Sequence, residues 1–117
     1  PDEAFDAAWV RALFDRAVAR LESECAAAGR PTDFHLFRRY DIDDAGRGEM
    51  TYEALAAETG LSASLVTNHL ARVRREFRRI LLETLREITG SDEEYRLEAR
   101  LLLGREAVGE TRSDADR

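Results

Sequence analysis

Small polar side chains and arginines alternate with apolar side chains between Ser62 and Arg79. At about 100° per residue, the apolar members fall on one side of a helix: Val66, Leu70, Val73 and Phe77. The opposite side starts with small polar residues and continues into arginines: Ser64, Asn68, Arg72, Arg75 and Arg79, flanked by Thr67, Arg74 and Arg78. Asparagine and arginine pair bidentately with base edges, and arginine also binds phosphate. The spacing therefore predicts a helix that hydrogen-bonds to nucleic acid.

Residue patterns that make or break covalent bonds are missing from the sequence. It contains no glycine-rich phosphate loop, no nucleophile elbow and no histidine placed as a general base, so we expect no catalytic residue and no enzyme. His35 and His69 have no third ligand nearby, and Cys25 is the single cysteine. We therefore predict neither a metal nor a cofactor, and we assign Cys25 to the core.

A short helix directly before Ser62 must position the predicted binding helix. Thr51 can cap a helix from Tyr52 to about Glu58, and Ser62 can cap the next one, which can run to about Thr89. Two helices joined by so short a turn must cross steeply.

That steep crossing needs three residue types at fixed places. It needs a small side chain where the helices approach, a residue that tolerates a left-handed backbone in the turn, and an apolar pin on the second helix. The sequence supplies Ala56, Gly60 and Val66 at this spacing. We predict that Leu55, Leu61 and Leu70 complete a small core around them.

The remaining sequence predicts three more helices and no strand. Apolar residues recur every four positions in residues 3–28, beginning with Phe5 and Trp9 and ending with Cys25. Thr32 or Asp33 can cap a short second helix, and residues 41–49 form an acidic loop. A capping box at Ser91 opens a last helix that ends near Gly104. We expect one all-α domain of about five helices over residues 1–104, followed by a disordered tail at 105–117.

Charge is distributed unevenly along the chain. The net charge is −6, yet residues 59–86 hold six arginines and two acids, a net of +4, between flanks of −6 and −4. A phosphate backbone responds to a local positive field as well as to the total charge. No apolar run approaches the ~18 residues of a membrane span, and the N-terminus lacks the pattern of a secretory signal. We expect a cytoplasmic protein without a membrane partner.

The stretch TYEALAAETGLSASLVTNHLARVRREFRR, at residues 51–79, resembles region 4 of bacterial sigma factors. It is most similar to the extracytoplasmic-function group, whose usual form is Y-x-E-I-A-x-x-L-G-x-S-x-x-x-V-x-x-x-L-x-R-x-R. The upstream AWVRALFDRAVARL also looks like the first helix of that region, so the resemblance covers roughly residues 3–103.

The resemblance implies a role for each polar residue of the binding helix. Four residues would read the −35 element of a promoter: Ser64, Thr67, Asn68 and Arg72. Five would bind phosphates: Ser62, Arg74, Arg75, Arg78 and Arg79. The domain would bind double-stranded promoter DNA, would dock on the flap of the RNA polymerase β subunit, and would be a target for an anti-sigma factor.

Three features depart from the family pattern. Thr59 stands where the family usually has leucine, the 29–50 segment is longer than the usual connector, and region 2 has no counterpart in this sequence. The chain is therefore expected to be the C-terminal domain of a larger sigma factor or, as the less favoured alternative, a stand-alone relative that cannot melt promoters.

Two other functions remain open at this point. The acidic flanks at 1–58 and 87–117 and the additional helices favour a protein-interaction module, which would bind polymerase, an anti-sigma-type inhibitor or its own copy. The third alternative is a conventional DNA-binding regulator that needs no polymerase contact and whose sensor domain lies outside this chain.

Overall fold

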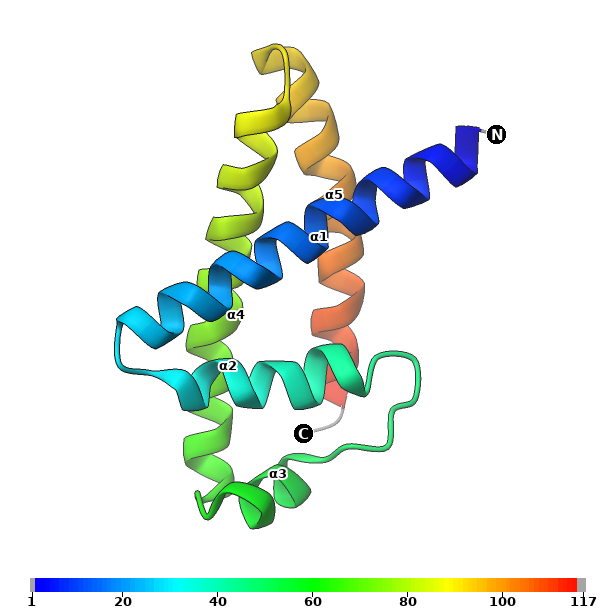
Figure 1. Cartoon of the computed structure of the whole chain (residues 1–117). Helices are drawn as coiled ribbons and strands as arrows, with labels where there is room; N and C mark the ends of the chain where they lie inside the picture. The colour runs from blue at the N-terminus through cyan, green and yellow to red at the C-terminus, as the bar shows by residue number, and fades with distance from the viewer. Residues whose placement is uncertain (1, 116–117) are drawn as a thin grey trace.

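The computed structural model describes the backbone of residues 2–115 and the side chains of residues 7–104. Within residues 2–115 the chain is all-α, as predicted. Its elements are α1 (Asp2–Ala27), α2 (Pro31–Phe37), the π-helical segment η1 (Arg38–Asp43), α3 (Tyr52–Thr59), α4 (Ala63–Ile88) and α5 (Asp92–Ala115). In Figure 1, α4 is the central helix: α1 and α2 cross it, α3 lies at its N-terminal end, and α5 runs beside it.

The core forms where α1 and α2 pack on one face of α4. The α4 residues of the predicted apolar face, Val66, Leu70, Val73 and Phe77, are all buried. Phe77 lies at the meeting point, with ring centroids 5.8 Å from Phe14 of α1 and 5.0 Å from Phe37 of α2. Burial of such aromatic and aliphatic side chains supplies most of the favourable free energy of folding. Cys25 is buried, as predicted, whereas the predicted core residue Phe5 lies outside the described side chains.

The segment before α3 differs from the prediction at both of its ends. Neither Thr32 nor Asp33 caps α2, because the helix begins one turn earlier, with Pro31 in its first turn and no side-chain cap. Proline suits that position because its missing N–H would have no helical partner there. Residues 41–43, predicted as loop, belong to η1, which continues α2 and buries Tyr40. The loop therefore begins only at Asp44.

The predicted turn between α3 and α4 is confirmed in detail. Gly60 adopts the left-handed conformation at φ +76°, and its N–H donates to the Ala56 carbonyl at 2.9 Å. Thr51 Oγ1 accepts from the Ala54 N–H, and Ser62 Oγ accepts from the Leu65 N–H, so both helices have side-chain N-caps. These local bonds place α3 across the start of α4 (Figure 1).

The last helix extends further than predicted. Ser91 Oγ accepts from the Glu94 N–H as expected, and the Glu94 carboxylate accepts from the Gly90 N–H. The α5 backbone remains helical past Gly104 to Ala115. One glycine inside a helix costs only about 1 kcal/mol relative to alanine, which is too little to end it. The side chains of 105–117, the segment predicted to be disordered, lie outside the described residues.

Candidate nucleic-acid interface

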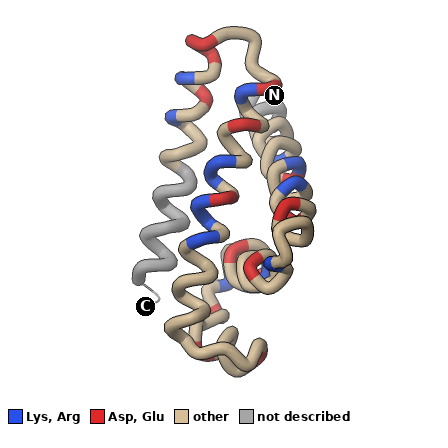
Figure 2. Tube along the Cα trace, turned by 90° about the vertical axis from the view of Figure 1, so that its left-hand side faces the viewer, with Lys and Arg blue, Asp and Glu red and all other residues tan. Residues whose placement is uncertain are grey.

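The first turns of α4 present small polar side chains to solvent. Ser62, Ser64 and Asn68 are exposed, and within the described part of the chain Ser64 and Asn68 make no side-chain hydrogen bond. Thr67 is half-buried, and its hydroxyl donates to the Ala63 carbonyl at 3.0 Å. We call residues 62–71 the α4 start. Its only ionisable side chain is His69, so this stretch of α4 carries neither blue nor red in Figure 2.

Arg72 is bound to a carboxylate from α2. Its Nε donates to Asp33 Oδ2 at 2.8 Å and its Nη2 donates to Asp33 Oδ1 at 2.9 Å. His69 Nδ1 lies 2.6 Å from the same Oδ1, and because a carboxylate can only accept, Nδ1 carries the proton of this contact. The Asp33 side chain is 3% exposed and that of Arg72 is 38% exposed. The sequence placed Arg72 on an open solvent face; the structure corrects this position.

The electrostatics of this cluster favour the ionised pair. Burial alone would raise the pKa of Asp33, but the hydrogen bonds from Arg72 and His69 outweigh burial and hold that pKa below its ordinary value. The same hydrogen bond raises the pKa of Arg72. Asp33 and Arg72 therefore form an ionised pair near neutral pH.

Arg74 lies in a pocket of aromatic and acidic side chains instead of flanking the solvent face. Its Nε and Nη2 donate to the two carboxylate oxygens of Asp41 at 2.9 and 3.0 Å, and its Nη1 donates to the Tyr52 hydroxyl at 3.1 Å. Its guanidinium carbon lies 5.4 Å from the centroid of the Tyr40 ring. Burial alone would lower the pKa of Arg74, but the hydrogen bonds and charge of Asp41 outweigh burial and raise that pKa above its ordinary value. Because only 18% of this side chain is exposed, its position suits holding η1 on α4.

Acids also surround two of the arginines further along α4. Arg79 Nη2 donates to Glu24 of α1 at 2.7 Å and to Glu76 at 2.8 Å, and its Nη1 donates to Glu83 at 3.1 Å. The hydrogen bonds that Arg79 donates to these glutamates raise its pKa. Arg86 is paired with Asp92. The net positive charge of residues 59–86 is therefore largely balanced by acids that fold back onto them, which the linear sequence did not indicate.

Two arginines of the predicted set remain on the outside of α4. Arg75 and Arg78 are both exposed. Among the described side chains, Arg75 makes no hydrogen bond and no ion pair. Among the predicted site residues, Arg72, Arg74 and Arg79 are bound by acids and form a bound group. Ser64, Asn68 and Arg75 make no side-chain hydrogen bond to a described residue and form an open group.

The sequence reasoning missed the acidic partners Asp33 and Asp41. Asp33 was interpreted as a helix cap, and Asp41 was interpreted as part of a loop. A buried aspartate two residues after a proline resembles a helix-cap pattern locally, so only its partners, 36 and 39 residues away, reveal its role.

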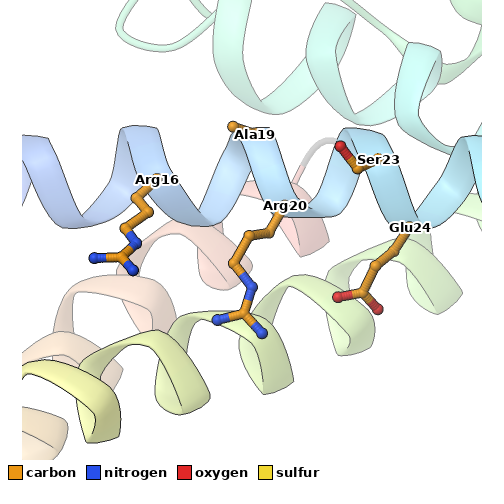
Figure 3. A pocket seen from close by; sticks show the side chains of 5 residues that line it. All are labelled: Arg16, Ala19, Arg20, Ser23 and Glu24. Atoms are coloured by element: carbon orange, nitrogen blue, oxygen red, sulfur yellow. The ribbon is translucent and has the colours of Figure 1, made fainter.

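The hollow drawn in Figure 3 lies along α1 and is lined by Arg16, Ala19, Arg20, Ser23 and Glu24. Arg20 and Glu24 reach from α1 toward α4, where Arg20 Nη1 donates to the buried Thr84 hydroxyl at 2.9 Å. Glu83 and Glu87 also lie within 3.5 Å of Arg20. These polar groups bind one another and fasten α1 to α4.

No protein-family model, curated protein or solved structure matches this chain. Within the described residues, no helix has the length and apolar character needed to cross a membrane. The same residues contain no group of three or more His, Cys, Asp or Glu side chains arranged to hold a metal ion. Functional inference therefore depends on the geometry of α3 and α4.

Proposed function

We propose that α3 and α4 form a helix-turn-helix unit that binds double-stranded DNA and reads a −35-type promoter element. The observation that carries the proposal is the turn at Gly60 followed by the Ser62 cap, which leaves the polar side of the α4 start exposed. In DNA-binding helix-turn-helix proteins, the early residues of the second helix contact base edges in the major groove. The resemblance to sigma region 4 adds docking on the RNA polymerase flap and a cytoplasmic location.

The base-reading role belongs to the exposed side chains of the α4 start. Asn68 carries an amide without a partner among the described residues, and an asparagine amide matches the N6 and N7 atoms of adenine. Ser64 lies one helical turn earlier on the same side and can donate or accept. Thr67 adds a methyl group and a hydroxyl oxygen that can only accept, because its proton is donated to the Ala63 carbonyl.

The phosphate-binding role is carried by fewer residues than the sequence predicted. Arg75, Arg78 and Arg79 are the exposed arginines of the predicted set, and Ser62 lies at the helix N-terminus, where backbone N–H groups favour an anion. Arg79 would have to exchange three glutamates for a phosphate, and Arg74 would have to leave a half-buried pocket. Weak, salt-sensitive binding by the chain alone is therefore part of the proposal.

A selection from random duplex DNA at low salt tests the proposal. The chain is used alone and then tethered to the polymerase flap, so that weak intrinsic affinity does not hide sequence preference. Recovery of one short motif, with reduced preference at one position in Asn68→Ala, is the expected result. Failure to enrich any motif in either format would contradict promoter reading.

A second candidate function is protein binding, which the exposed apolar side chains of α5 favour. Leu97 and Leu101 are 55% and 56% exposed and lie one helical turn apart. In this alternative the partner is polymerase, an anti-sigma-type inhibitor or a second copy of the chain. Size-exclusion chromatography with and without short duplex DNA separates the two functions, because a dimer that ignores duplex would favour protein binding.

A further inference from the structure

The Arg72 guanidinium has two hydrogen-bonding edges, and the fold occupies only one of them. Asp33 binds the edge made by Nε and Nη2 in a bidentate pair, and Nη2 also lies 2.9 Å from His69 Nδ1. Nη1 makes no hydrogen bond or ion pair with any described residue. With 38% of the side chain exposed, the edge that carries Nη1 remains accessible. The Arg72 side chain is therefore fixed by Asp33, while its Nη1 donor group remains available for another partner.

Asp33, the residue that binds Arg72, is buried and fixed in place by its neighbours. Asp33 lies in the first turn of α2, next to Phe34, Leu36 and Phe37, which are buried in the core. Its own side chain is 3% exposed, and His69 fixes the carboxylate from a second direction. Asp33 is thus a rigid anchor supplied by one helix to the side chain of another.

We propose that Asp33 is a positioning residue for DNA reading, which orients Arg72 so that its Nη1 edge binds a guanine in the major groove. The proposal rests on the DNA-binding function proposed above and names the base that Arg72 recognises. Arginine donates to the O6 and N7 atoms of guanine, which is the commonest specific contact in protein–DNA complexes. An arginine that is already oriented loses less rotamer freedom on binding than a free one.

Another ion pair of the same chemistry provides the matched control. Arg39 of η1 donates through Nε and Nη2 to Glu58 of α3 at 2.8 and 3.1 Å. This pair is also bidentate and also joins the segment before α3 to the α3–α4 unit, but among the described residues it makes no hydrogen bond or ion pair with α4. Asp33→Asn and Glu58→Gln each remove one negative charge, so both strengthen attraction to DNA of every sequence by a similar factor.

The experiment measures binding to four duplexes that differ only at the base position whose preference is abolished by Arg72→Ala. Wild-type chain should prefer guanine there, and Asp33→Asn should reduce that preference about tenfold, within the ~5- to 150-fold range that a bidentate base contact supplies. Glu58→Gln should leave the preference unchanged. Asp33→Asn should add nothing in the Arg72→Ala background, because the two residues act through one contact. Asp33→Glu, which keeps a carboxylate, should retain more of the preference than Asp33→Asn.

NMR detection of the Arg72 Nε–H gives a readout that does not depend on DNA. A resolved, slowly exchanging signal is expected in the wild-type chain and in Glu58→Gln, and its loss is expected in Asp33→Asn with the fold retained. The inference is overturned if Asp33→Asn changes the affinity for all four duplexes by the same factor, since that result indicates a purely structural ion pair. If the wild-type chain enriches no motif from random duplex DNA, that result overturns the proposed function itself, and the positioning role with it.

Discussion

The start of α4 and the remainder of the same helix have opposite surroundings. Residues 62–71 contain no Arg, Lys, Asp or Glu, and their polar side chains Ser64 and Asn68 face solvent. From Arg72 onward, acids from α1, α2 and η1 bind three of the arginines, Arg72, Arg74 and Arg79, at distances of 2.7–3.0 Å. The difference teaches that one continuous helix separates two tasks: its start is available for recognition, and its middle fastens the bundle. Arg72 lies at the boundary: it is bound to Asp33, and in the proposed function it would also contact DNA.

The largest expected effect comes from breaking an ion pair in the fastening part. Asp41→Asn leaves Arg74 charged in a half-buried pocket, so we expect the free energy of unfolding to fall by about 2–3 kcal/mol, below the ~3–5 kcal/mol of a fully buried pair. Urea denaturation measures this loss. Glu58→Gln, in a more exposed pair, should change it much less. Equal losses of unfolding free energy in the two variants would contradict the conclusion that Arg74 lies in a half-buried pocket.

At the helix start, the same kind of change should alter recognition and leave stability intact. Asn68→Ala removes an exposed amide, so the unfolding midpoint should stay near that of the wild type. Preference at one base position should fall by ~1–3 kcal/mol. Competition binding with single-base variants of the selected duplex measures the fall. A destabilised variant with unchanged preference would place Asn68 in the fastening part of the helix.

Arg75 tests whether an exposed arginine in the middle of α4 still serves recognition. Arg75→Ala should weaken binding to all duplexes alike and reduce the slope of log Kobs against log salt by about one unit, because one phosphate contact is lost. Arg79→Ala should reduce the slope less, since glutamates already neutralise Arg79. If Arg79→Ala has the larger effect, the acids around it give way to phosphate on binding.

The smallest expected effect is on the pH dependence of stability at the boundary residue. Since the folded pKa of Asp33 is below its ordinary value of 3.8, the ion pair contributes fully above about pH 4. Its contribution is lost as the pH falls from there through the lowered folded pKa. Asp33→Asn lacks this component, so its stability should approach that of the wild type below pH 4. Parallel stability curves down to pH 2 would contradict an ionised, hydrogen-bonded Asp33.

Local patterns predicted the parts of the fold that depend on neighbouring residues. The caps at Thr51 and Ser62, the left-handed Gly60 and the apolar face of α4 all follow from interactions within a few residues. The boundaries of α2 and the end of α5 were predicted less well. A proline can end one helix or begin the next, and a glycine can end a helix or lie inside it. Tertiary packing determines which of these occurs at Pro31 and at Gly104.

Helical periodicity by itself determined that this chain is all-α and that the polar side of α4 begins at Ser64, because period and capping act over a single turn. Only the tertiary structure decided which arginines remain available. The acids that bind Arg72, Arg74 and Arg79 across the fold lie 39, 33 and 55 residues away in the sequence, where no local pattern can pair them. Ion pairing depends on distance in space, and that distance is set by how α1 and α2 cross α4.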